Sequence, residues 1–156
     1  MRLLTTPTLL VALLAGCRPA PAGDAGFAGV QARGETAMGV DQYTSTHQFE
    51  PLPDGGRIVL QRDTADSAGT AVIREHMERI ETAFAAGDFR LPGFVHAGEV
   101  PGTAIMTARR AAIRYAADTL PRGGQLRIRT TDPAAIRAVH EFLAFQRADH
   151  HAGPHP

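Results

Sequence analysis

Hydrophobic and polar residues form the same local pattern at two places in the chain, and this pattern predicts paired strands. In segment 125–129, Leu126 and Ile128 alternate with Arg127 and Arg129, which is typical of a strand with one buried and one solvated face. Segment 57–61 has a similar strand-like composition. Each of these strands follows a Pro-x-Gly-Gly turn, at 53–56 and 121–124, where proline presets φ and glycine accepts positive φ. A second candidate strand precedes each turn, at 46–52 and 112–119.

A helix is predicted after each of the two hairpins. The first begins near 63–67 and ends near Ala86, with Gly87 as its stop signal. The second begins at Thr131 or Asp132, carries Pro133 in its first turn and ends near Ala148. The helical period places one apolar stripe on each helix. The stripes are Ile73, His76, Met77, Ile80, Ala83 and Phe84 on the first, and Ile136, Val139, His140, Leu143 and Gln146 on the second.

These elements predict an α+β fold built from duplicated ββα units, about 44–87 and 111–148. We expect them to form a four-stranded antiparallel sheet with two helices on one face, within a single domain spanning 41–150. The connection 88–110 is rich in Gly and Pro and is expected to be an irregular loop that packs down through Phe89, Phe94, Val95 and Val100. Residues 151–156 are expected to be a disordered tail.

The N-terminus has the features of an export signal. Arg2 and the short apolar stretch 3–14 predict a signal peptide over 1–16, because this stretch is too short to span ~30 Å of hydrocarbon. It ends in Leu14-Ala15-Gly16-Cys17, which resembles the lipobox of bacterial lipoproteins. That resemblance implies acylation of Cys17 with palmitate-like chains and attachment to a membrane. The alternative is an ordinary secretory signal followed by a chance cysteine.

Residues 17–40 are predicted to be the lipidated cysteine and a flexible tether, because they are rich in Pro, Ala and Gly and contain few large apolar side chains. The latter part of this segment, around Met38, is a candidate for docking on the domain. The expected location is the cell envelope. Arg18 follows the cysteine in place of the Asp associated with inner-membrane retention, so the outer membrane, on its periplasmic side, is favoured if the host has two membranes.

Composition argues against several classes of function. Sixteen basic and sixteen acidic residues balance, so no net field attracts nucleic acid. The chain contains no Lys, which excludes a Schiff-base or P-loop lysine. Neither Ser45 nor Ser67 lies in a Gly-x-Ser-x-Gly elbow, and the chain has no Cys-x-x-Cys-His for covalent haem.

Histidines are the main candidates for chemistry. His76 and His140 lie on the two helical stripes, His47 lies at the start of the first strand, and His96 and Met106 flank the irregular loop. Neutral imidazole and thioether ligands suit copper, and imidazole also suits zinc. We therefore predict a copper or zinc site, or a small-ligand site, formed by these five residues. In the competing interpretation each ring is a core residue bonded to a backbone carbonyl. The tail histidines 150, 151 and 155 are either loose metal ligands or a solvated tail, and His150 is the one that is also compatible with the second helix.

Two further functions are compatible with the sequence. One is a non-catalytic module that docks on another envelope protein. The other is a small acid–base enzyme in which His96 pairs with Glu99, although the pattern favours a binding protein over an enzyme. Within the predicted loop and the strand that follows it, Phe94, Glu99 and Tyr115 are expected to contact a ligand. The sequence indicates no particular oligomeric state.

A set of short motifs runs through the chain beyond the tether: Arg33-Gly34, Met38-Gly39-Val40-Asp41-Gln42, Thr44, Thr46-His47-Gln48-Phe49, Gly87-Asp88-Phe89, His96, Pro101-Gly102, Met106, Ile113-x-Tyr115, Gly123-Gly124 and His140-x-Phe142-Leu143-x-Phe145-Gln146. With these motifs the chain resembles a bacterial family of small, often exported proteins of uncharacterised function. This sequence departs from the family at Val40, where Phe is usual, and at Gln48, where a second His is usual. The resemblance implies one packed unit from about Arg33 to His150 and no established activity.

Overall fold

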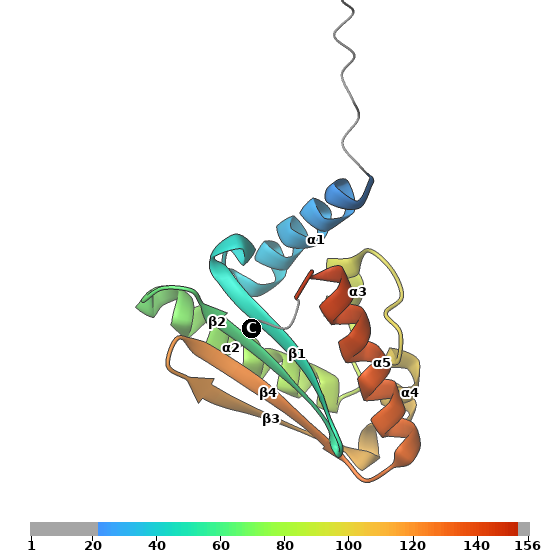
Figure 1. Ribbon diagram of the computed structural model, residues 1–156. Helices are drawn as coiled ribbons and strands as arrows, with labels where there is room; N and C mark the ends of the chain where they lie inside the picture. Colours follow the sequence, from blue (N-terminus) through green and yellow to red (C-terminus); the bar gives the residue numbers. More distant parts are fainter. Residues whose placement is uncertain (1–21, 153–156) are drawn as a thin grey trace, which may run out of the picture.

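The computed structural model describes residues 22–152, and within them the predicted α+β fold is confirmed. Four antiparallel strands form one sheet in the order β1-β2-β4-β3 (Figure 1). The two hairpins therefore meet through β2 and β4, which pair along the centre of the sheet. The strands are β1 (Ser45–Leu52), β2 (Gly55–Arg62), β3 (Ile113–Leu120) and β4 (Gly123–Thr130).

The first glycine of the Gly-Gly pair in each turn is required by the contact between the hairpins. Gly55 has φ +133°, and a Cβ there would overlap the carbonyl oxygen of Ile128 in β4. A Cβ on Gly123 would in the same way overlap the carbonyl oxygen of Leu60 in β2. The repeated turn motif thus reverses each hairpin and also allows its inner strand to begin directly against the other hairpin.

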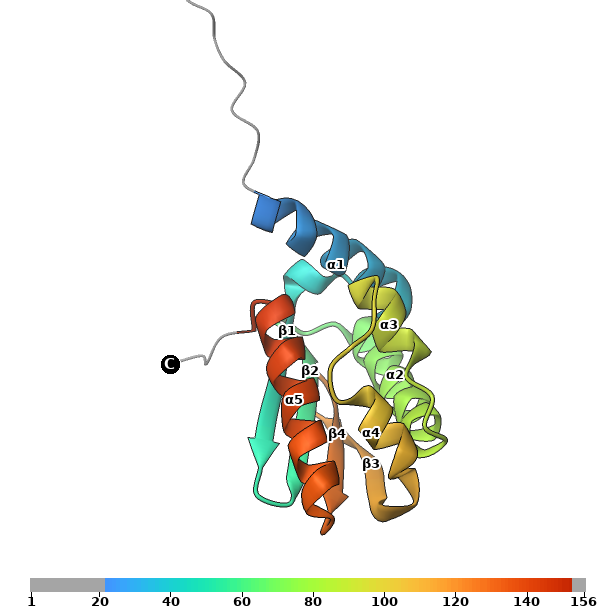
Figure 2. The ribbon, with the colours of Figure 1, turned by 90° about the vertical axis from the view of Figure 1, so that its right-hand side faces the viewer.

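Two long helices cover one face of the sheet, as predicted (Figure 2). Helix α2 (Ser67–Ala85) packs on β3 and β4, and α5 (Pro133–Asp149) packs on β1 and β2, so each helix mainly covers the hairpin of the other unit. Asp66 and Asp132 are the N-caps, and their carboxylates accept hydrogen bonds from the first backbone N–H groups of each helix. The core lies between the helices and the sheet.

The predicted stripe of α2 is buried as expected, but that of α5 is rotated. Ile136 and His140 are only half-buried, and the side chains facing the sheet are Ala135, Ala138, Val139, Phe142, Leu143 and Gln146. The reason is the close approach of α5 to the start of β2. A Cβ on Gly56 would overlap Leu143 and lie 3.3 Å from Val139. Helix α5 therefore contacts β2 through the side that carries these two residues.

The predicted flexible tether is wrong over the part that the structure describes. Residues Ala22–Met38 form helix α1, which ends where Gly39 adopts φ +76°. Val30 and Met38 are buried, and the Nε of Arg33 donates a hydrogen bond to the carbonyl oxygen of Val95, 2.7 Å away. An Ala-rich segment with few apolar residues is helical here because it packs on the rest of the domain. The predicted signal peptide and Cys17 lie outside the described residues.

The predicted irregular loop is also largely helical. It contains α3 (Arg90–His96), α4 (Thr103–Ala108) and the 3-10 turn η2 (Arg110–Ala112); a second 3-10 turn, η1 (Gln42–Thr44), precedes β1. Val95, Val100 and Met106 are buried, so the segment does pack down. Phe94 does not, because 47% of it is exposed.

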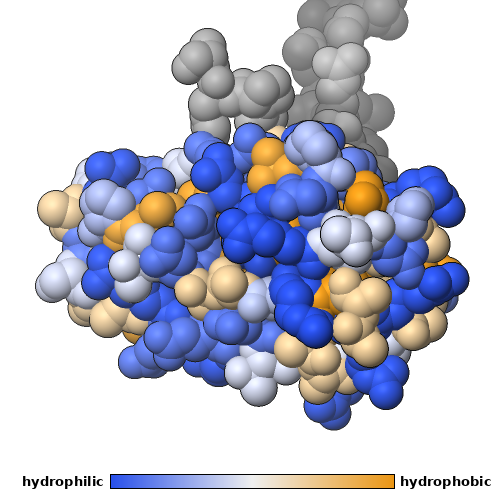
Figure 3. Space-filling model, turned by 90° about the horizontal axis from the view of Figure 1, so that it is seen from below, coloured by the Kyte–Doolittle hydropathy of each residue, from blue (hydrophilic) through white to orange (hydrophobic). Residues whose placement is uncertain are grey.

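The face shown in Figure 3, seen from below the view of Figure 1, is mainly hydrophilic, with separate apolar residues between charged ones. Such scattered apolar residues are normal on a protein surface and do not indicate an interface. None of the helices in residues 22–152 combines the length and apolar character needed to cross a bilayer.

Candidate functional site: a histidine-lined cavity

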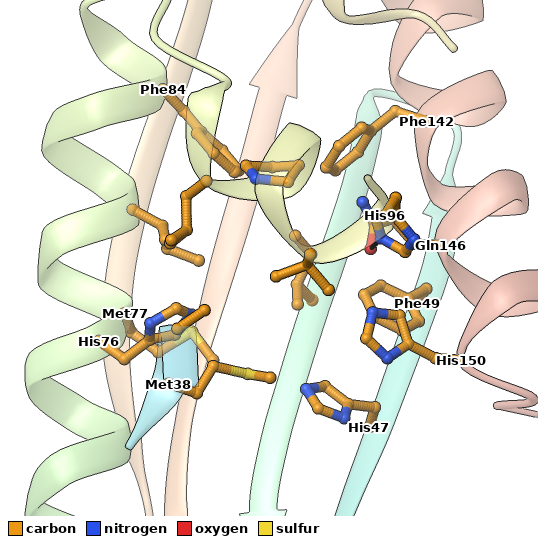
Figure 4. A pocket seen from close by; sticks show the side chains of 16 residues that line it. Met38, His47, Phe49, His76, Met77, Phe84, His96, Phe142, Gln146 and His150 are labelled. Atoms are coloured by element: carbon orange, nitrogen blue, oxygen red, sulfur yellow. Dashed lines mark hydrogen bonds between the residues drawn. The ribbon is translucent and has the colours of Figure 1, made fainter. Parts of the chain in front are cut away.

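A cavity of about 60 Å³ lies between α2 and α5 on the helix-covered face of the sheet. A buried water molecule needs about 10–15 Å³ of such volume, so the cavity has room for about four to six water-sized groups. Its histidines come from four elements: His47 from β1, His76 from α2, His96 from the end of α3 and His150 from the end of α5 (Figure 4). The other lining residues are largely apolar: Ala37, Met38, Phe49, Ile58, Met77, Ile80, Phe84, Leu91, Pro92, Val95, Phe142 and Gln146.

His47 and His150 form a pair on one side of the cavity. Their ring centroids are 5.0 Å apart, and Phe49 lies beside both rings, with centroid distances of 5.6 Å to His47 and 5.4 Å to His150. His150 is the C-cap residue of α5, so the last turn of this helix delivers its imidazole to the first strand of the sheet.

His76 and two thioethers lie on the side of α2. His76 is 6% exposed, and its neighbour Met77 is 2% exposed. Met38, at the end of α1, extends between the α2 side and His47 (Figure 4). The Nδ1 atoms of His76 and His150 are buried and have no hydrogen-bond partner among the described residues. Buried polar atoms of this kind usually have a partner, which makes these two nitrogens candidates for contact with a ligand.

Burial keeps three of these imidazoles neutral at pH 7. It lowers the pKa of His47 well below its usual value, with His150 and His76 adding smaller effects of the same sign. It lowers the pKa of His76 to about 4, with a contribution from Arg79. Burial also lowers the pKa of His150 to about 4; His96 acts in the same direction, and Asp149 opposes it. A neutral imidazole has a free lone pair, which is the form that binds metals.

His96 has a different environment, because both of its ring nitrogens contact α5. Its side chain is 1% exposed, Nδ1–H donates to the carboxylate of Asp149, and Nε2 lies 2.8 Å from Oε1 of Gln146. The ring is perpendicular to that of His150, with centroids 5.1 Å apart. A carboxylate on Nδ1 fixes the orientation of an imidazole, as it does behind many metal ligands and catalytic bases. The predicted partner of His96, Glu99, is exposed, so that pairing is wrong.

Four other predicted site residues lie away from the cavity lining. The Nε2–H of His140 donates to the carbonyl oxygen of Leu52, 2.9 Å away, and this residue lies about 15 Å along α5 from His150. Met106 is fully buried in the core, and Phe94 points to solvent. Tyr115 packs on Phe84 in the core, where burial raises the pKa of its hydroxyl.

His150 is the cavity histidine that was not among the predicted ligands. It follows Gln146 by four residues and Leu143 by seven, so it continues the buried face of α5. That spacing is the sequence signal that could have identified His150 as a residue on the buried face. Met38 was missed because it lies in the segment predicted to be a tether, and Met77 because its place on an apolar stripe indicates only a core residue.

Two glycines of α1 and its end, Gly34 and Gly39, help to place Met38 at the cavity. Gly34 lets α1 approach η1, because a Cβ there would lie 3.2 Å from both Gln42 Oε1 and the Met38 methyl. Gly39 then turns the chain at the end of α1. Gln48, next to His47 in β1, is exposed, because neighbouring strand residues point to opposite faces. It therefore contributes no ligand to the cavity.

Within residues 22–152, no three His, Cys, Asp or Glu side chains are arranged so that they could hold a metal ion. A four-coordinate zinc site of the usual kind is therefore not preformed in this region. The cavity offers imidazole pairs and thioethers instead.

No family model matches this chain, and neither a curated protein nor a solved structure matches it.

Proposed function

We propose that the protein is a lipid-anchored envelope protein that binds a soft transition-metal ion, Cu(I), in its histidine-lined cavity. His47 and His150 are the proposed imidazole ligands, and the thioether of Met38 is the proposed third ligand. The observation that carries the proposal is the pair of neutral imidazoles, 5.0 Å apart between centroids, beside a methionine in a largely apolar cavity.

The donor set favours copper over zinc. Thioethers are soft ligands that select Cu(I), whereas a structural Zn(II) site usually takes four tetrahedral Cys or His ligands. Within residues 22–152 no group of three borderline or hard ligands converges. Cys17 is the sole cysteine of the chain, and acylation at the lipobox would remove its thiol from metal binding. Zn(II) is therefore the weaker candidate for this cavity.

Cu(I) affinity should depend on His47 and His150 and not on His140. We expect His47→Ala and His150→Ala each to weaken binding by at least roughly tenfold, or about 1.4 kcal/mol, since each removes one of two or three ligands. His140→Gln is the matched control, because His140 donates to the Leu52 carbonyl outside the cavity lining. The Cu(I) affinity of this variant should equal that of the wild-type protein. The measurement is competition of the purified full chain with a chromophoric Cu(I) chelator under reducing conditions.

A His155→Ala variant reports any contribution of the tail to the same titration. The proposal is wrong if the affinity of the full chain survives both cavity substitutions, or if His155→Ala alone abolishes it. Parallel titration with Zn(II) tests the choice of metal: binding of Zn(II) in preference to Cu(I) contradicts it.

A second candidate function rests on the Asp149–His96 pair. A carboxylate on Nδ1 orients the imidazole of His96 for proton transfer, the ring lines the cavity, and its Nε2 is placed to donate to Oε1 of Gln146. In this alternative the cavity binds a small organic molecule and His96 transfers a proton. It predicts that Asp149→Asn impairs turnover of that molecule while leaving Cu(I) affinity unchanged.

A further inference from the structure

Two of the three exposed large apolar side chains among the described residues lie at one end of the molecule. Tyr43, in η1, is 66% exposed and Phe94, in α3, is 47% exposed. Both elements adjoin α1, and Figure 1 and Figure 2 show α1 and α3 together at one end, with α4 farther from that end. The third such side chain, Ile105, lies on α4 and is 46% exposed.

Phe27 extends this group along α1. Its ring stacks on His151 with centroids 4.0 Å apart and meets Tyr43 edge-on at 6.5 Å. We call Phe27, Tyr43 and Phe94, which lie on α1, η1 and α3, the aromatic end surface. Aromatic side chains with one polar and one apolar part are favoured at the boundary between lipid headgroups and acyl chains, and Tyr43 has that character.

The position of the proposed anchor brings the same end to the membrane. Four residues, Arg18 to Pro21, separate Cys17 from the first residue of α1. Even when fully extended, this connection spans at most about 18 Å from Cys17 to Ala22. The start of α1 must therefore stay close to the bilayer in which the acyl chains are held, and a rigid helix continues from there into the domain.

We propose that the aromatic end surface docks on the lipid bilayer and holds the domain in a fixed orientation, with α1 and α3 towards the membrane and α4 away from it. This inference rests on the proposed acylation of Cys17 and is independent of metal binding. The partner of the aromatic end surface is the interfacial region of a phospholipid bilayer, because the short connection to Cys17 keeps this end of the domain close to the bilayer.

The absence of tryptophan from the chain makes the orientation directly measurable. We would place a single reporter in the lipidated full chain by Tyr43→Trp or Phe94→Trp, with Ile105→Trp as the matched control of similar exposure to Phe94. The proteins are reconstituted in vesicles of phosphatidylethanolamine and phosphatidylglycerol containing brominated lipid. Interfacial docking should quench the fluorescence of a reporter at position 43 or 94 by at least roughly twofold and leave a reporter at position 105 nearly unchanged, because bromine quenches only at short range and this end alone faces the headgroups.

Vesicle flotation of the same samples separates the two proposals, with Cys17→Ser as the unanchored control. Protein that floats with vesicles but shows equal quenching at positions 43 and 105, or none at either, would overturn docking while the anchor stands. Wild-type protein that does not float would overturn the anchor and docking together. Floating protein with quenching confined to positions 43 and 94 supports the inference.

Discussion

Lowering the pH from 7 to 4 is expected to destabilise the metal-free protein, and His76 accounts for about 3 kcal/mol of the loss. Burial lowers the pKa of His76 from 6.5 to about 4 in the folded state, whereas the unfolded chain has the ordinary value. Below pH 6.5 the unfolded state gains a proton that the folded state does not bind, so stability falls until the pH reaches the folded pKa. At about 1.36 kcal/mol per pKa unit, a shift of this size corresponds to about 3 kcal/mol.

His76→Leu is the test of that assignment, since leucine fills the site without titrating. Urea unfolding at pH 7 and pH 4.5 should show a smaller loss of stability for this variant than for the wild-type protein. Burial also lowers the pKa of His47 and of His150, and these two residues contribute equally to the loss in both proteins, so the difference between the two losses reports His76. His140→Leu is the control for replacing a histidine outside the cavity lining by leucine. Equal pH dependence of His76→Leu and wild type between pH 6.5 and 4.5 would falsify the assignment.

The carboxylates affect a lower pH range, so they do not obscure this test. Hydrogen bonds from Arg90 lower the pKa of Asp88 to about 2, and the N-cap hydrogen bonds lower the pKa of Asp66 and Asp132 below the usual 3.8. Groups of this kind stabilise the fold above their unfolded pKa, and that contribution is lost as the pH falls from about 3.8 towards the folded values.

Gly102→Ala is expected to be the most destabilising addition of a single methyl group in the connection between the two units. Gly102 has φ +82°, which an L side chain rarely adopts, and a Cβ there would overlap the carbonyl oxygen of Ala138 in α5. Backbone strain and the clash act together, and we expect a loss of about 3 kcal/mol or more. In a domain of this size that corresponds to a fall in Tm of roughly 6–12 °C.

Gly98→Ala is the matched control for this substitution. Gly98 is exposed, its φ is not positive, and the nearest heavy atom to an added Cβ is 4.0 Å away. We expect its Tm to change by no more than roughly 2 °C, as for other surface substitutions. A Gly102→Ala variant as stable as Gly98→Ala in thermal unfolding would contradict the close approach of this connection to α5.

The strands could be predicted from the sequence because their signals are local. The alternation of Leu126 and Ile128 with arginines defines a strand face, and the Pro-x-Gly-Gly turns define where each hairpin reverses. Helix starts at Asp66 and Asp132 follow equally from local capping. Helix α1 was missed because its apolar residues are too few for a helix to be stable alone; Val30 and Met38 are buried by distant parts of the chain.

The candidate site was predicted only in part. His47, His76 and His96 do line one cavity, whereas His140 does not, because α5 is turned so that Val139 and Leu143 face the sheet instead. The orientation of α5 about its own axis depends on which small residues allow close packing. Here that residue is Gly56, which lies beneath α5. The helical period of the sequence indicates a buried face but not its orientation to that accuracy.

The amino-acid sequence by itself determined the repeated hairpin-helix unit, the turns and the helix caps, since each depends on residues within a few positions of one another. Only the tertiary structure decided which imidazoles lie close together. His47 and His150 lie at opposite ends of the domain sequence, and His96 finds its carboxylate in Asp149 and not in the nearby Glu99. These contacts result from the packing of α3 and α5 on the sheet. The spacing of residues along the chain does not predict how distant elements pack against one another.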